Sequence, residues 1–160
     1  MLNIYTVAFF GHRNLNNYLK VEKLLEAEIR KIIYENEYIE FLVGRNGEFD
    51  ICVSSVVKRL QKEYRSDNSS LVLALPYITA EYANNKINFE EYYDSVEISY
   101  NASVAHPMAA IQIRNQEMVD RADLIICYVE DTCGGAYKTM QYAHKCKKKV
   151  FNIANIPDIQ

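Results

Sequence analysis

Two adjacent glycines, Gly134 and Gly135, precede a stretch with helical periodicity, and such a pair can bind an anion. Without side chains, their backbone N–H groups approach a phosphate closely, and the dipole of the following helix favours negative charge. Tyr137 and Thr139 follow within the first turns of that helix. A tight turn needs no ligand, however, so the pair indicates an anion site only together with other residues.

Polar side chains also follow the apolar run Ile4 to Phe10. Gly11 comes first, and His12 and Arg13 then offer two planar hydrogen-bond donors. A guanidinium group binds a phosphate through two parallel hydrogen bonds. We therefore expect Arg13 to neutralise an anion at the end of this run.

A third polar string follows the apolar run Tyr38 to Val43. It contains Gly44, Asn46, Gly47 and Asp50. Asp50 either caps the following helix or accepts a hydrogen bond from a ribose hydroxyl. Neither G-x-G-x-x-G nor G-x-x-x-x-G-K-[ST] occurs in the sequence, so a nucleotide must be held by another arrangement.

Arg114 and Asn115 fall on the more polar side of a later predicted helix, one turn before Met118. An arginine there is either solvated or part of the site. The three histidines and four cysteines lack metal-ligand spacing, so we expect no metal and no required cofactor, with a bound nucleotide as the one candidate ligand.

The elements that must position these residues alternate along the chain. Apolar runs predict strands at Ile4 to Phe10, Tyr38 to Val43, Leu71 to Leu75, Leu124 to Val129 and Val150 to Ala154, and residues at three- and four-residue steps predict helices between them. The pattern predicts an α/β fold, a Rossmann-like open, mostly parallel sheet with helices on both faces. The strand-to-helix turns of such a sheet share one edge, so the glycine-containing strings should converge in one electropositive hollow.

The pattern fails between Ile78 and Ala105, which we interpret either as an excursion that covers the site or as a surface loop with a short helix.

The 160 residues, 49% of them hydrophobic, fit a single domain over 1–160. A net charge of -3 leads us to expect no nucleic-acid partner. The longest early apolar run is too short for a membrane span, so we expect no membrane contact and a cytoplasmic location.

Together these strings resemble the SLOG superfamily, the Rossmann-like group that contains the LONELY GUY phosphoribohydrolases and the DprA proteins, and within it the small stand-alone YpsA-like branch. The matching strings are Phe10 to Arg13, Val43 to Gly47 with Phe49-Asp50, Arg114-Asn115 followed by Met118 to Asp120, Ala122-Asp123, Gly134 to Tyr137 and Tyr142-Ala143. The resemblance implies a nucleotide pocket across the carboxyl ends of the strands, usually in a homodimer.

The resemblance also raises the question of catalysis. The LONELY GUY enzymes cleave an N-glycosidic bond with an arginine, which Arg114 matches, and a glutamate, where this chain has Tyr142. Such cleavage passes through an oxocarbenium-like state that a carboxylate stabilises, and a neutral tyrosine does not replace it. Glu117, Glu130 and Asp131 are the candidate substitutes.

The leading hypothesis is a small-molecule binding protein for a nucleotide or nucleotide-derived ligand, with a sensory or regulatory use. Gly134 and Gly135 would bind phosphate, Arg13 and Arg114 would neutralise it, Asp50 or Asn46 would contact the sugar, and Tyr77 or Tyr137 would stack on the base. One alternative is an N-glycosidase acting on a nucleoside monophosphate. The other is an interaction scaffold that uses the tyrosine-rich segment Glu81 to Tyr100.

Overall fold

Six parallel strands form the sheet in the computed structural model, which describes residues 1–157. The strands are β1 (Ile4–Gly11), β2 (Tyr38–Val43), β3 (Ser69–Leu75), β4 (Ser95–Ile98), β5 (Leu124–Tyr128) and β6 (Lys149–Asn152). Their spatial order is β4-β3-β2-β1-β5-β6, with every neighbouring pair parallel. The predicted α/β, Rossmann-like class is confirmed.

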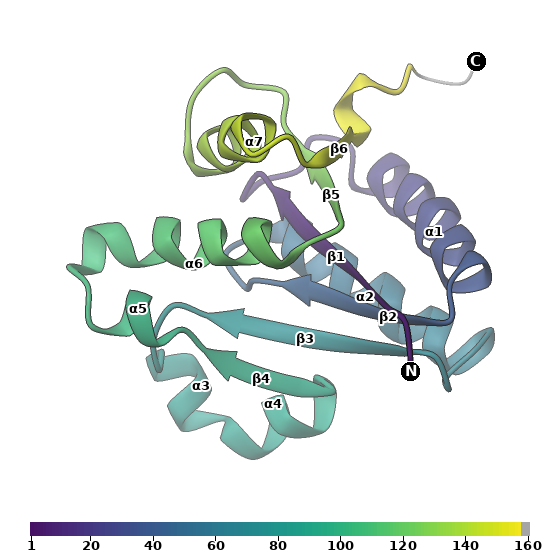
Figure 1. The fold of residues 1–160 in the computed structure, drawn as a ribbon, viewed down its shortest axis with the longest axis horizontal. Helices are drawn as coiled ribbons and strands as arrows, with labels where there is room; N and C mark the ends of the chain where they lie inside the picture. Colours follow the sequence, from purple (N-terminus) through teal and green to yellow (C-terminus); the bar gives the residue numbers. More distant parts are fainter. Residues whose placement is uncertain (158–160) are drawn as a thin grey trace.

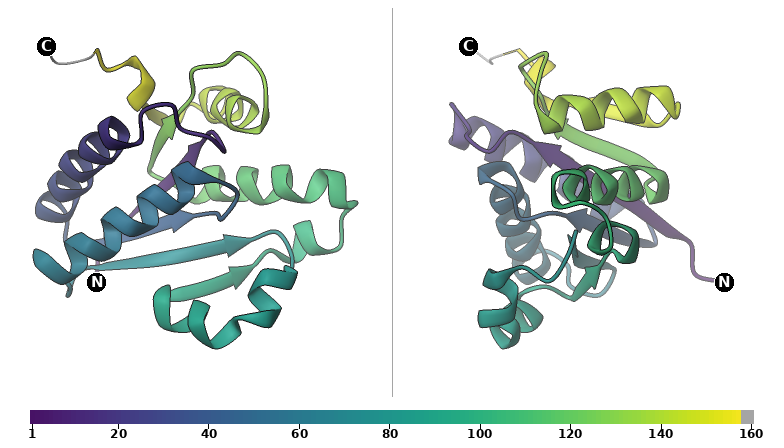
Figure 2. Two further views of the ribbon diagram at one scale, coloured as in Figure 1. Left: turned by 180° about the vertical axis from the view of Figure 1, so that it is seen from behind. Right: turned by 90° about the vertical axis from the view of Figure 1, so that its left-hand side faces the viewer.

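Helices cover both faces of this sheet (Figures 1 and 2). The helices α1 (Tyr18–Glu35) and α2 (Glu48–Glu63) pack on one face, and α6 (Pro107–Arg121) and α7 (Gly135–Lys145) on the other. Shorter helices are α3 (Ala80–Asn84), α4 (Lys86–Tyr92), α5 (Tyr100–Ser103) and the 3-10 turn Ile153–Asn155. Each face has its own apolar core, because consecutive strand residues point to opposite sides of the sheet.

Local sequence accounts for the long helices. In α1, Val21, Leu25 and Ile29 are fully buried at four-residue spacing, and the Asn17 side chain caps the first turn by accepting a hydrogen bond from the Lys20 N–H. In α6, His106 is the N-cap and Pro107 stands at the first helical position, where no N–H is required. These contacts fix where both helices begin.

The order of connections creates a crevice between β1 and β5. The chain runs outward from β1 to β4, and α6 then returns it to the other side of β1, where β5 pairs alongside in the register Phe10–Cys127 and Gly11–Tyr128. The loops that leave two such strands turn in opposite directions, so a crevice opens at their carboxyl ends. The site should therefore lie at the end of β1.

The segment from Ile78 to Ala105 is not an irregular excursion, and the alternative of a surface loop with a short helix is correct only in its helical part, because the segment contains α3, α4 and α5. It contains the edge strand β4, whose residues Val72–Ser95 to Leu75–Ile98 pair with β3. Tyr82, Phe89 and Tyr93 are buried in the same core as α1 and α2. The segment therefore completes the sheet and one core.

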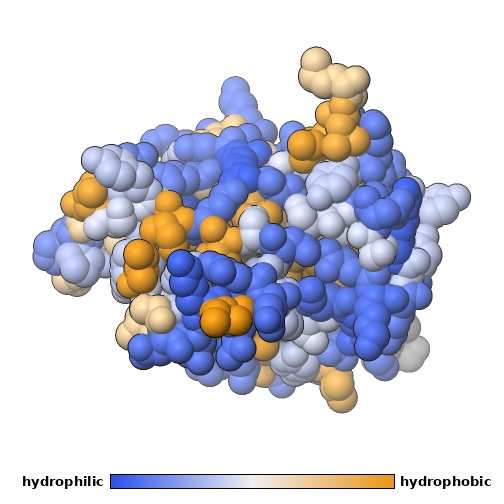
Figure 3. Space-filling model, turned by 90° about the horizontal axis from the view of Figure 1, so that it is seen from below, coloured by the Kyte–Doolittle hydropathy of each residue, from blue (hydrophilic) through white to orange (hydrophobic). Residues whose placement is uncertain are grey.

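This result also bears on the interaction-scaffold hypothesis, because much of the tyrosine-rich segment is structural. Figure 3 shows this side of the molecule, where apolar patches stand among hydrophilic side chains. Ile78, Ile87 and Val104 are among the exposed apolar residues.

No helix within residues 1–157 combines the length and apolar character needed to cross a membrane.

Candidate functional site

A pocket of about 400 Å³ opens at the carboxyl ends of β1, β2 and β5. Ten of the fourteen predicted site residues line it, namely Gly11, His12, Arg13, Gly44, Asn46, Asp50, Arg114, Asn115, Gly134 and Gly135. They come from four separate parts of the chain, and the sheet topology brings them together. Their role in binding stays a prediction, but their convergence is a structural fact.

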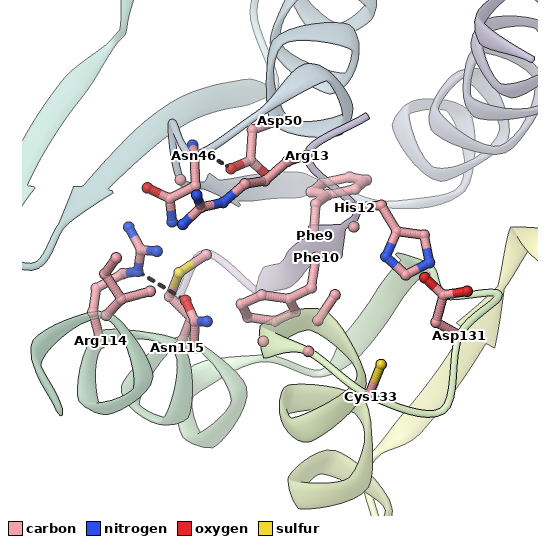
Figure 4. A pocket seen from close by; sticks show the side chains of 17 residues that line it. Phe9, Phe10, His12, Arg13, Asn46, Asp50, Arg114, Asn115, Asp131 and Cys133 are labelled. Carbon is pink, nitrogen blue, oxygen red and sulfur yellow. Dashed lines mark hydrogen bonds between the residues drawn. The ribbon is translucent and has the colours of Figure 1, made fainter. Parts of the chain in front are cut away.

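The two arginines lie on the same side of this pocket (Figure 4). Arg13 follows β1 and is exposed, whereas Arg114 comes from α6. Asp50 and Asp131 also line the pocket. The pocket lining therefore holds both signs of charge, with Asp131 as an acidic residue in addition to the predicted Asp50.

Arg114 is buried, not on a polar, solvated face as the helical pattern indicated. Its side chain lies among core residues with 2% of its surface exposed. Its Nε donates to Asn115 Oδ1 at 2.9 Å and its Nη1 donates to the Ala74 carbonyl at 2.8 Å. Among residues 1–157 no carboxylate lies within ion-pair distance of it, and burial lowers its pKa. A buried guanidinium without an ion pair is costly unless an anion binds it.

A chain of hydrogen bonds connects Arg114 to the Gly-Gly turn. Asn115 accepts from Arg114 and donates through Nδ2 to Thr139 Oγ1 at 3.2 Å. Thr139 is fully buried and donates to the Gly135 carbonyl at 2.9 Å. The guanidinium and the start of α7 are thereby held in a fixed relation before any ligand arrives.

The turn itself requires glycine at Gly134. This residue has φ 93° and ψ 175°, a backbone conformation that is essentially limited to glycine. It is the N-cap of α7, and no side chain caps the helix and no acidic residue stands in its first turn. The first backbone N–H groups of α7 are therefore available to an anion, as are those of any uncapped helix start.

Asp50 is buried beside the arginine, with 9% of its surface exposed. Its Oδ2 accepts from the Asn46 N–H at 2.9 Å. A Cβ atom built on Gly44 would lie 3.1 Å from both Asp50 Oδ2 and Arg114 Nη1, so the missing side chain makes room between the two charges. Asp50 therefore stabilises the loop before α2, whose N-cap is Gly47, and still faces the pocket.

Burial raises the pKa of Asp50, against the opposing effects of the Asn46 N–H and Arg114. A raised folded-state pKa means that the folded protein binds the proton more tightly than the unfolded chain, so stability falls as pH rises from the ordinary aspartate range through the folded-state pKa.

Asp50→Asn keeps an acceptor for the Asn46 N–H but has no carboxyl group to ionise. As pH rises through that window, we expect the unfolding free energy of wild type to fall relative to that of the variant. Urea unfolding of both proteins from pH 4 to pH 8 measures this difference. Equal pH profiles, or a relative loss by the variant at high pH, would contradict the burial argument.

One of the two ring nitrogens of His12 is already used as a hydrogen-bond acceptor, so it does not donate to a ligand in the pocket. Its Nε2 accepts from the Glu130 N–H at 2.8 Å, which leaves Nδ1 as the nitrogen able to donate. The ring also contacts Tyr128 edge-on, with 6.0 Å between ring centroids. His12 therefore fixes the loop after β5, and Figure 4 shows Asp131 of that loop beside the ring.

Four predicted site residues lie outside the pocket lining: Gly47, Tyr77, Tyr137 and Thr139. A Cβ on Gly47 would come within 2.4 Å of Arg13 Cα, so this glycine allows the two loops to pack together. Tyr77 follows β3, two strands away from β1, and Tyr137 packs against the core under α7. Neither tyrosine lies where it would stack on a base in this pocket.

Seven lining residues were not predicted: Phe9, Phe10, Ile111, Met118, Asp131, Cys133 and Ala136. Met118 could have been predicted, because it lies four residues after Arg114 and therefore on the same face of α6, where it is part of the core. Asp131 and Cys133 lie in the loop after β5, where no periodicity applies.

The residues considered for catalysis are scattered. Tyr142 donates to Asp120 Oδ1 at 2.7 Å and does not line the pocket. Of the three candidate carboxylates, Asp131 lines the pocket, while Glu117 lines a neighbouring cavity and Glu130 lines neither. Of these three candidates, only Asp131 is placed where an N-glycosidase at this site would use it; Asp50 is the other carboxylate of the lining.

Comparison with known proteins identifies the fold. No family model and no curated protein sequence matches the chain. Among solved structures it is similar to DNA processing protein A from Helicobacter pylori, with a TM-score of 0.66 and 16% identity over 92% of this chain and 64% of that one. It is also similar to DprA from Streptococcus pneumoniae, with a TM-score of 0.67 and 13% identity over 93% of this chain and 50% of that one.

The likeness shows a shared fold, and the chain spans 64% and 50% of the length of these two proteins. DprA proteins belong to the superfamily that the sequence resembles, whereas the YpsA-like branch and a homodimer stay predictions.

One sequence-based expectation needs correction. The Helicobacter pylori protein binds single-stranded DNA, which overturns the exclusion of nucleic acid as a partner. The physical reason is that net charge averages over the whole surface, whereas a phosphate responds to the few groups within about a Debye length of ~10 Å.

Proposed function

We propose that the pocket at the ends of β1, β2 and β5 binds the phosphate of a nucleotide unit, and that the protein recognises this unit without transforming it. The observation that carries the proposal is Arg114, which is almost fully buried, has no ion pair within residues 1–157 and lines the pocket. A phosphate would supply an anion at hydrogen-bond distance from this guanidinium, whereas the nearby Asp50 carboxylate affects it only from beyond ion-pair distance.

The other pocket groups support the same assignment. The uncapped start of α7 offers backbone N–H groups, and Arg13 makes no side-chain hydrogen bond or ion pair within the described residues. Asn46 is exposed at the rim and is available to a sugar hydroxyl. Phe10 and Met118 supply apolar walls for a base. A sensory or regulatory use is consistent with recognition alone.

A nucleotide unit has two sources, a free nucleotide or single-stranded DNA. Both present a phosphate beside a sugar and a base, and the fold is shared with a protein that binds single-stranded DNA. The chemistry at Arg114 is the same for both, so binding measurements must separate them.

Thermal unfolding with AMP, adenosine, inorganic phosphate and a ten-nucleotide single-stranded DNA tests the proposal. A ligand at 100 times its Kd adds ~2.7 kcal/mol to the unfolding free energy, which raises Tm by about 5–10 °C for a domain of this size. We expect AMP to raise Tm and adenosine to leave it unchanged, because only AMP carries the phosphate. No shift with millimolar AMP or with the DNA would contradict the proposal.

The same series separates the two sources. A DNA strand that binds at least tenfold more tightly than AMP, with an affinity that falls steeply as salt increases, identifies DNA. AMP binding as tight as that of the strand identifies a free nucleotide.

A further inference from the structure

A second cavity of about 290 Å³ lies beside the proposed phosphate site, at the carboxyl ends of β3 and β4. Arg114 and Met118, one turn apart on α6, line both cavities. The two hollows therefore lie on either side of this pair of side chains. Both volumes fall near the lower end of the ~300–1,000 Å³ range of small-molecule sites.

The second cavity combines apolar walls with one distinctive carboxylate. Leu42, Leu75 and Ile98 provide apolar surface. Glu117, from α6, accepts from Ser99 Oγ at 2.7 Å and from Asn101 Nδ2 at 3.0 Å. No lysine or arginine within residues 1–157 forms an ion pair with it, whereas Glu97 in the same cavity pairs with Arg121 at 2.6 Å.

The hydrogen bonds of Glu117 hold its carboxylate in place and leave some of its acceptor positions free. Two carboxylate oxygens provide about four acceptor positions, and each oxygen here receives one donor from the protein. The remaining positions suit N–H donors of a flat, largely apolar ring. The exocyclic amino groups of adenine and cytosine offer two such hydrogens each, whereas thymine has no amino group and offers only the single N–H between its two ring carbonyls.

We propose that this second cavity binds an amino-bearing nucleobase whose N–H group donates to Glu117, while the adjoining phosphate binds Arg114. The ligand then extends across both cavities, as a dinucleotide or two successive nucleotides of a strand do. This inference rests on the proposed function, because it places the phosphate at Arg114. It adds the second subsite and a preference among bases.

Calorimetric titration with AMP, d(ApA), d(CpC) and d(TpT) tests the second subsite on the unmodified protein. We expect d(ApA) and d(CpC) to bind about tenfold more tightly than d(TpT), the factor typical of one charge-assisted hydrogen bond. Equal affinity for the three dinucleotides would overturn the base preference, and equal affinity for AMP and d(ApA) would overturn the second subsite.

Glu117→Gln tests the assigned carboxylate. The variant should lose the advantage of d(ApA) over d(TpT) and keep wild-type affinity for AMP, whose single base the proposed function places against Phe10 and Met118 in the first pocket. Glu91→Gln, an exposed position on α4 outside both cavities, removes the same charge and should retain the advantage. Retention of the advantage in Glu117→Gln would overturn the role of Glu117.

The outcomes separate this inference from the proposed function. Binding of AMP with no preference among the dinucleotides leaves the phosphate site in place and overturns the second subsite. Absence of binding by AMP and by every dinucleotide overturns both. Thermal unfolding of each variant without ligand verifies that it is folded.

Discussion

Arg114→Met is expected to weaken AMP binding by about 10- to 150-fold, the factor that corresponds to ~1.5–3 kcal/mol for a charge-assisted hydrogen bond to phosphate. The methionine retains much of the aliphatic packing and removes the guanidinium. Titration calorimetry on the wild type and the variant measures the change.

The same substitution should cost the free protein little stability. It removes the hydrogen bonds to the Ala74 carbonyl and to Asn115 Oδ1, but it also removes a buried charge that has no ion pair within residues 1–157. Replacing buried charges with apolar groups of similar volume is often neutral or stabilising. We expect the unfolding free energy to remain within ~2 kcal/mol of wild type.

Arg30→Met is the matched control, because Arg30 is an exposed arginine on α1 that pairs with Glu26 at 3.2 Å. It should bind AMP like the wild type. Full affinity in the Arg114 variant, or an equal loss in the Arg30 variant, would show that the buried guanidinium is not the phosphate ligand.

The second large effect is expected at the Gly-Gly turn. Gly134→Ala places a side chain on a residue with φ 93° and ψ 175°, and such strain costs about 1–3 kcal/mol. The unfolding free energy should fall by that amount, and Tm by roughly 2–10 °C. Relief of the strain turns the first amides of α7 away from the pocket, so AMP affinity should fall as well.

The neighbouring glycine provides a close control. Gly135 begins α7 with no atom within 4 Å of an added Cβ and with no positive φ. Gly135→Ala should change the unfolding free energy by less than ~0.5 kcal/mol. Differential scanning calorimetry distinguishes the two variants, and equal Tm values for both would refute the strain argument.

Sequence patterns predicted the central strands well because each is buried on both faces and reads as a continuous apolar run. The edge strand β4 was missed because only Val96 of Ser95–Ile98 is partly buried while its other residues are exposed. Nothing in four such residues distinguishes a strand from a loop. These residues form a strand because they pair with β3, and that pairing depends on tertiary structure.

The candidate site was predictable in its glycines and arginines but not in its electrostatics. The rule that parallel strand ends converge placed Gly11, Gly44 and Gly134 together. Burial of Arg114 was not predictable, because helical periodicity assigns a charged residue to the solvated side by default. Asp131 was missed as a lining residue because irregular loops carry no periodic signal.

Alkylation of Cys133 tests the location of the ligand most directly. Cys133 lines the pocket beside Gly134, Cys52 and Cys127 are buried, and Cys146 is the other exposed cysteine. In a Cys146→Ala protein, iodoacetamide should therefore label Cys133, and saturating AMP should slow the labelling severalfold while equimolar adenosine leaves it unchanged. Labelling of Cys133 at an unchanged rate under saturating AMP would contradict a phosphate bound between Arg114 and the start of α7.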